Sequence, residues 1–80
     1  MAIVEIKDRI LKDLDIFSEN MKKLDVKQLG EEEKKVVDMA EMYAKDARSW
    51  LSRGDLYTSF SSISYAHGLL DAVRKMEGIE

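Results

Sequence analysis

Apolar residues recur at intervals of three and four in three segments of the chain, which is the spacing of one face of an α-helix. The first stripe comprises Ile3, Ile6, Ile10, Leu14, Phe17, Met21 and Leu24. The second comprises Val36, Ala40, Tyr43, Ala47 and Trp50, and the third Leu56, Ser59, Ile63, Ala66, Leu70 and Val73. These stripes predict helices over residues 2–24, 31–53 and 56–76.

The two breaks in the pattern carry the residues that end and begin helices. Gly30 precedes a run of three glutamates. Negative side chains are favoured at the positive, N-terminal end of a helix dipole, so this pattern indicates a helix start. In "SRGD", Gly54 suits the left-handed residue after a helix and Asp55 suits the cap of the next one. So short a connection predicts an antiparallel helical hairpin. We therefore expect one domain over residues 1–80, an all-α, three-helix antiparallel up-down-up bundle.

Composition and charge narrow the function classes. The chain has no cysteine and a single histidine, and no Asp/Asn-rich loop of calcium-binding spacing, so we expect no metal site and no cofactor. The net charge of −3, with both signs interleaved, disfavours nucleic acid as a partner. No unbroken apolar segment is long enough for a membrane span, and charges begin within five residues of the start. We expect a cytoplasmic protein.

One long stretch carries no ionic side chain. Residues 56–70 contain no Asp, Glu, Lys or Arg, although 36% of the chain is charged and about five charges would be expected there. Two interpretations account for this. Either the third helix lies at the centre, wedged between and covered by the other two, or its second face meets another chain, most simply a two-fold copy of itself.

A helical projection identifies that second face. Opposite the core stripe of the third helix lie Tyr57, Ser61, Ser64, Tyr65, Gly68 and Ala72. Small residues four apart, at Ser64, Gly68 and Ala72, permit close approach of another helix. Tyrosine is enriched at the energetic centres of interfaces. The sequence thus predicts a non-enzymatic interaction module, whose partner is another protein or a second copy in a homodimer.

An alternative interpretation concerns His67 and Asp71, which lie four apart on the flank of this helix. A carboxylate at that spacing can orient an imidazole. With Tyr65, the two would line a pocket in a small-ligand or nucleotide-handling helical domain that assists an enzyme. No nucleophile motif or phosphate loop accompanies them, so we predict no catalytic residues and no enzymatic activity.

The stretch "AEMYAKDARSWLSRGDLYTSFSSISYAHGLLDA", residues 40–72, resembles an uncharacterised archaeal family of small helical proteins, domain of unknown function 357. Three parts carry the resemblance: Tyr43 with Asp46 and Ala47, the turn at Gly54 and Asp55, and "SYAHGLLDA" from residue 64 to 72. The resemblance implies an all-helical fold and an archaeal, cytoplasmic origin. It brings no catalytic residues with it.

Overall fold

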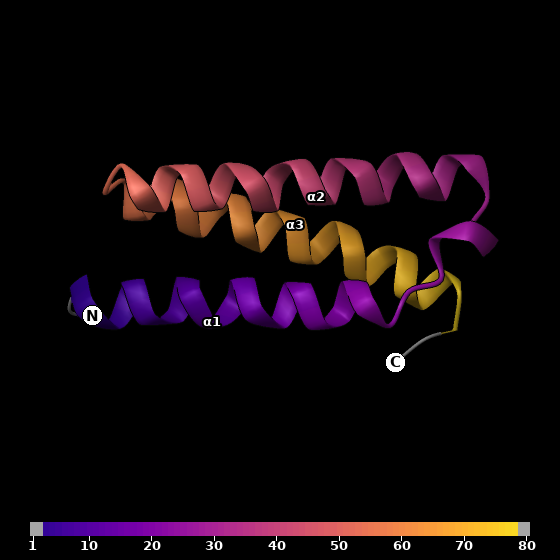
Figure 1. Ribbon diagram of the computed structural model, residues 1–80, viewed down its shortest axis with the longest axis horizontal. Coiled ribbons are helices and arrows are strands. Elements are labelled where there is room, and N and C mark those ends of the chain that lie inside the picture. Colours follow the sequence, from indigo (N-terminus) through magenta and orange to yellow (C-terminus); the bar gives the residue numbers. More distant parts are fainter. Residues whose placement is uncertain (1–2, 79–80) are drawn as a thin grey trace.

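Three α-helices account for nearly all of the chain (Figure 1). In this computed structural model, which describes the backbone of residues 3–78 and the side chains of residues 5–78, they are α1 (Ile3–Lys22), α2 (Glu31–Ser52) and α3 (Leu56–Met76). A 3-10 turn, η1 (Val26–Gln28), joins α1 to α2, and no strand occurs within residues 3–78. The predicted all-α, up-down-up bundle is confirmed. The expected helix start at residue 2 lies outside the described residues.

Helix α3 is the central element of an elongated bundle measuring 40 × 20 × 15 Å. It packs extensively on α2 and also on α1, whereas α1 and α2 have little contact with each other. Figure 1 shows α3 running between the other two helices. Helix α3 thus has the central position that one of the two interpretations of its charge-free stretch assigned to it.

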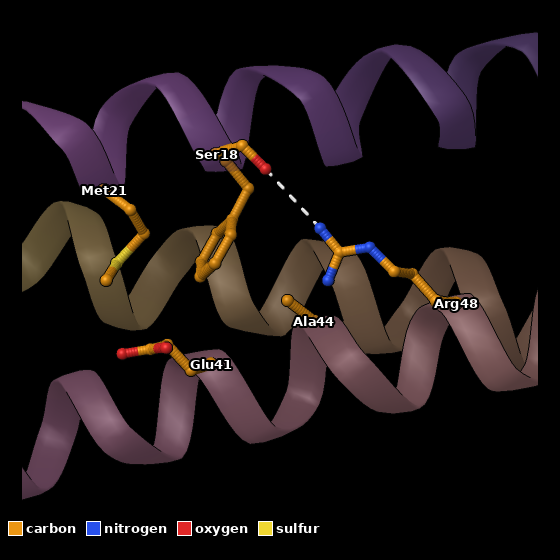
Figure 2. Close-up of a pocket in the computed structure, with 6 residues that line it drawn as sticks. Ser18, Met21, Glu41, Ala44 and Arg48 are labelled. Carbon is orange, nitrogen blue, oxygen red and sulfur yellow. Dashed lines mark hydrogen bonds between the residues drawn. The ribbon is translucent and has the colours of Figure 1, made fainter.

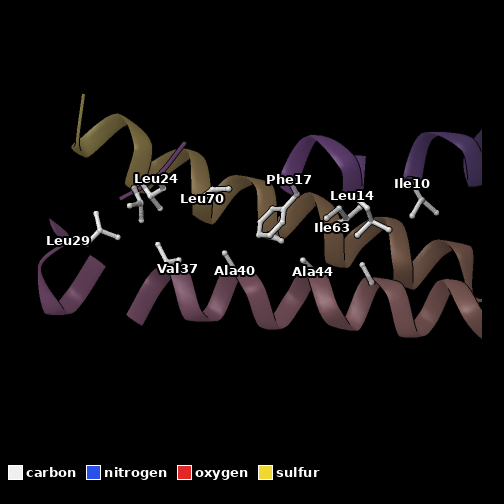
Figure 3. Packing of buried hydrophobic residues seen from close by; sticks show 13 residues of the cluster. Ile10, Leu14, Phe17, Leu24, Leu29, Val37, Ala40, Ala44, Ile63 and Leu70 are labelled. Atoms are coloured by element: carbon white, nitrogen blue, oxygen red, sulfur yellow. The ribbon is translucent and has the colours of Figure 1, made fainter. Parts of the chain in front are cut away.

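The core is a single cluster of buried apolar side chains from all three helices and the first connection (Figure 3). Its members are Ile10, Leu14, Phe17, Leu24, Leu29, Val37, Ala40, Ala44, Ala47, Ile63, Ala66, Leu70 and Val73. The predicted stripe of α3 is buried from residue 59 to residue 73, and only Leu56 at its start is half-buried. Leu24 and Leu29 flank η1, so the connection between α1 and α2 is fixed to the core at both of its ends.

The predicted stripe of α2 is wrong in its centre. Its buried residues are Val37, Ala40, Ala44 and Ala47, while Tyr43 and Trp50 are only half-buried. The reason is steric, because alanines let the backbones of two helices come close, whereas aromatic rings would hold them apart. The ring of Tyr43 lies instead beside α3, where it packs on Tyr65, and the ring of Trp50 lies under the guanidinium of Arg53.

One polar side chain belongs to this seam. Ser59 of α3 is completely buried, and its hydroxyl donates a hydrogen bond to the carbonyl oxygen of Ala47 in α2 at 2.7 Å. A serine at this position is small enough for the closely packed seam and has its hydrogen-bonding group satisfied.

The hairpin between α2 and α3 closes in a Schellman motif. The N–H of Gly54 donates to Leu51 O at 3.1 Å, and the N–H of Asp55 donates to Trp50 O at 3.0 Å. Gly54 has φ +82°, the left-handed conformation that glycine adopts without strain. Asp55 then caps α3, because its Oδ1 accepts the N–H of Thr58 at 3.0 Å. Both residues have the roles predicted for them.

Candidate functional site

The six residues predicted to form the second face of α3 are all exposed on one side of the helix. Tyr57, Ser61, Ser64, Tyr65, Gly68 and Ala72 are exposed, and together we call them the outward face. The interpretation that α1 and α2 cover this face is therefore wrong. Because α1 and α2 pack against the opposite side and the flanks of α3, the chain itself leaves the outward face open.

Gly68 lies at the middle of the outward face and has open space beside it. A Cβ built on Gly68 would meet no atom within 4 Å. No contact inside the described chain therefore requires a glycine at this position. With Ser61 and Ser64 on the preceding turns, Gly68 makes the centre of the outward face low and smooth.

The two tyrosines differ in how firmly they are held. Tyr65 is 51% exposed and packs edge to face on Tyr43 of α2, with ring centroids 4.7 Å apart. Tyr57 is 85% exposed at the start of the helix. Tyr65 thus marks the side of the outward face that borders α2, whereas Tyr57 stands out from its N-terminal end.

An apolar hollow adjoins the outward face on the side of α1. It has a volume of about 280 Å³ and is lined by Ile6, Leu56, Tyr57 and Phe60. The guanidinium of Arg9 lies over the ring of Phe60, 5.6 Å from its centroid, which is a cation–π distance. The border of the outward face along α1 is therefore aromatic and carries a positive charge.

The three residues of the predicted ligand pocket have separate partners. The Nε2 atom of His67 lies 2.8 Å from the carbonyl oxygen of Asp13 in α1. Because a carbonyl only accepts, this ring nitrogen carries the hydrogen. The imidazole also stands edge to face on Phe17, with centroids 5.8 Å apart. His67 thus joins α3 to α1.

Asp71 and Tyr65 have partners elsewhere. Asp71 Oδ1 lies 3.5 Å from Nη1 of Arg74, one turn later in the same helix. Tyr65 points toward α2, on the other flank of α3 from His67. The structure thus brings His67 and Asp71 onto neighbouring turns of one flank but places Tyr65 apart from them.

A second hollow, of about 250 Å³, lies between α1 and α2 (Figure 2). Phe17, Ser18 and Met21 of α1 line it together with Glu41, Ala44 and Arg48 of α2. Nη2 of Arg48 reaches across to the hydroxyl of Ser18 at 3.5 Å, and Figure 2 shows this bridge above α3. Sequence patterns gave no signal for this groove, because it results from how far apart α1 and α2 are held by α3.

Two carboxyl groups at the ends of α3 have shifted pKa values. The backbone N–H of Thr58, with a further bond from its hydroxyl, holds the pKa of Asp55 below its ordinary value of 3.8. At the other end, a side-chain hydrogen bond with Glu33 of α2, aided by desolvation and repulsion between the carboxylates, raises the pKa of Glu77 above 4.5. Neither group lies on the outward face.

The match to known families covers most of the chain. A family model described as "Protein of unknown function (DUF357)" matches residues 12–79. The chain belongs to this family. The DUF357 match includes all of α2 and α3, and hence every residue of the outward face and both residues of the hairpin turn. No curated protein matches the chain.

The described residues contain neither a membrane-spanning helix nor a cluster of metal ligands. No helix within the described residues is long and apolar enough to cross a membrane. No group of three or more His, Asp or Glu side chains in the described part of the chain is placed to hold a metal ion.

Proposed function

We propose that this DUF357 protein is a small non-enzymatic interaction module that associates with a second copy of itself through the outward face of α3. One observation carries the proposal: the outward face is exposed, yet residues 56–70 contain no charged side chain in a chain that is 36% charged. Solvent-facing positions of a helix are ordinarily polar or charged. Exposed positions without charge favour a surface that is covered on association.

The choice of residues on the outward face supports the same proposal. Glycine inside an exposed helix costs about 0.8 to 1 kcal/mol relative to alanine, and serine is also a weaker helix former. Gly68 has room for a Cβ, so no internal contact requires this cost. A glycine at this position lowers the surface and lets another backbone approach, which would offset the lost helix stability.

The aromatic residues at the border would supply binding energy. Tyr65 is already held in place by Tyr43, so its ring loses little conformational freedom when a partner covers it. Large, fixed tyrosine side chains are frequent energetic centres of protein interfaces. The family resemblance favours an archaeal, cytoplasmic setting for this association, and we include that setting in the proposal.

The proposal is tested by the mass of the protein in solution. For the wild type, sedimentation equilibrium should give about twice the chain mass of 9.2 kDa. Gly68→Arg places a long charged side chain at the centre of the outward face, where the monomer has space for it. This variant should keep its helical circular dichroism spectrum and sediment as a monomer.

Ser49→Arg is the matched control. Ser49 is an exposed small residue within α2, outside the outward face, and should tolerate arginine without change in association. A wild type that sediments as a monomer, or a Gly68→Arg variant that keeps the wild-type mass, would contradict the proposal.

A further inference from the structure

We propose that the outward face of α3 is covered by a second copy of the chain whose α3 runs antiparallel to the first, about a two-fold axis level with Ser64 and Tyr65. This inference rests on the proposed function and adds to it the direction and the register of the second copy. The charged residues near the outward face favour the antiparallel direction of the two α3 helices, and the sizes of the side chains on that face favour this register.

Charges at the C-terminal end of α3 argue against a parallel pair. Lys75 lies two turns beyond Gly68, on the same side of the helix, and is exposed. In a parallel two-fold pair each residue meets its own copy, so Lys75 would face Lys75 of the second copy. Like charges that face each other destabilise an interface. In an antiparallel pair, Lys75 instead lies level with the turn at Gly54 and the capping carboxylate of Asp55.

The flank that borders α1 offers a complementary pair of charges. His67 and Phe60 mark this flank, because they contact Asp13 and Arg9 of α1 respectively. Asp71 follows His67 by one turn and so lies on the same flank. A two-fold axis perpendicular to α3 places the α1 flanks of both copies beside each other.

Asp71 would then lie close to Arg9 of the second copy. In the antiparallel register Asp71 is level with Thr58 of the second copy, two residues or about 3 Å along the helix axis from Phe60. Arg9 lies over that phenylalanine ring and presents its guanidinium at the same border. By symmetry, the dimer contains this pair of opposite charges twice.

The sizes of the side chains fit the register. With the axis level with Ser64 and Tyr65, Ser61 is level with Gly68 of the second copy, so the small residues meet where the helices approach most closely. Tyr57 is level with Ala72 of the second copy, which leaves space for its exposed ring. The contact extends over about 22 Å of helix, from residue 57 to residue 72.

Cysteine cross-linking tests the direction, since the chain contains no cysteine of its own. A mixture of Ser61→Cys and Gly68→Cys chains in a glutathione redox buffer should form the mixed disulfide. Gly68→Cys alone should not link, because its two copies are offset by about 10 Å along the helix axis. Ser49→Cys, on an exposed part of α2 outside the outward face, is the control for random collision and should stay unlinked.

Charge reversal tests the flank independently. Arg9→Asp and Asp71→Arg should each weaken dimerisation by about tenfold, and the double variant should recover most of the loss. Circular dichroism and urea unfolding would confirm that each variant is folded. Loss without recovery in the double variant would overturn the placement of Asp71 beside Arg9.

The outcomes separate this inference from the proposed function. If the wild type is a dimer, Gly68→Cys links to itself and the mixture forms no mixed disulfide, the two α3 helices are parallel. This result would contradict the antiparallel direction but support the proposed association. A wild-type dimer in which no outward-face cysteine links, although the cysteine variants keep the dimer mass under reducing conditions, would place the interface elsewhere. A wild-type monomer at all concentrations would contradict the proposed self-association as well.

Discussion

The hydroxyl of Ser59 donates a 2.7 Å hydrogen bond to the carbonyl oxygen of Ala47, across the seam between α2 and α3. This relationship explains why a serine lies in a stripe of otherwise apolar residues. The seam needs a small side chain, and the carbonyl of the facing helix satisfies its one polar group. On α2, three alanines and one valine form the buried face of this contact, and larger side chains of α3, such as Ile63 and Leu70, pack against it.

Ser59→Ala should lower the free energy of unfolding by about 1 kcal/mol, because it removes one buried hydrogen bond and leaves little empty space. Ser59→Val should lower it by about 2 kcal/mol, since the added methyl groups must fit into a closely packed seam. Urea unfolding followed by circular dichroism measures both. Ser61→Ala, on the outward face, is the control and should leave the fold at least as stable. If Ser59→Val were as stable as the wild type, α2 and α3 would not be packed so closely.

The Nε2 atom of His67, and not Nδ1 alone, should carry a ring hydrogen. Its bond to the carbonyl of Asp13 requires this, because the carbonyl oxygen can only accept. Imidazole nitrogen chemical shifts measured by NMR distinguish the two tautomers. A dominant Nδ1–H tautomer would mean that the contact with Asp13 is absent in solution, which would favour a ligand role for His67.

Asp55 makes the stability of the bundle sensitive to acid. Its pKa is lowered in the folded state, so its contribution is complete above the ordinary value of 3.8 and is lost as the pH falls through the lower, folded value. Asp55→Asn keeps a capping oxygen but does not titrate. The wild type should therefore lose stability relative to Asp55→Asn as the pH falls below about 3.8. Parallel urea midpoints of the two proteins in this range would contradict the capping role.

The acid pair at the other end of α3 has the opposite pH dependence. The pKa of Glu77 is raised by its hydrogen bond with Glu33. The stabilisation by protonated Glu77 is therefore complete below the ordinary pKa of 4.5 and is lost as the pH rises through the folded pKa. Glu77→Gln keeps a donor for Glu33 and removes the repulsion. It should be more stable than the wild type at neutral pH and equal to it in acid. Thermal midpoints compared at the two pH values test this, and a constant difference between the proteins would contradict it.

Gly68→Ala should affect folding and association in opposite directions. The free energy of unfolding of the monomer should rise by about 0.8 to 1 kcal/mol, because alanine is the better helix former and its Cβ meets no atom within 4 Å. Dimerisation should weaken, because the added methyl group keeps the two helices apart. Urea unfolding at low protein concentration and sedimentation at high concentration measure the two effects separately. An alanine variant that is more stable and associates as strongly as the wild type would exclude Gly68 from the interface.

Most of the fold could be predicted from local sequence signals. The left-handed Gly54 and the cap at Asp55 depend on residues within a turn of each other and agree with the structure, and the described helix ends lie within two residues of the predicted ones. The centre of the buried face of α2 could not be predicted in this way, because a helical projection weights Tyr43 and Trp50 by their hydrophobicity. Close packing instead favours the alanines between them.

The candidate site was predictable in part. The charge-free run and the helical period gave the outward face and its six residues, and the structure places all of them in solvent on one side of α3. The partners of the flanking side chains were not predictable. The carbonyl of Asp13 beside His67 and the guanidinium of Arg9 over Phe60 depend on how α1 is placed along α3, which only tertiary packing determines.

The mass of the wild-type protein across a range of concentrations tests the central claim most directly. Sedimentation equilibrium should show a reversible change from 9.2 kDa toward twice that mass as the concentration rises, and Gly68→Arg should remove the change. A wild type that stays at 9.2 kDa over the whole range would show that α3 of a second copy does not cover the outward face.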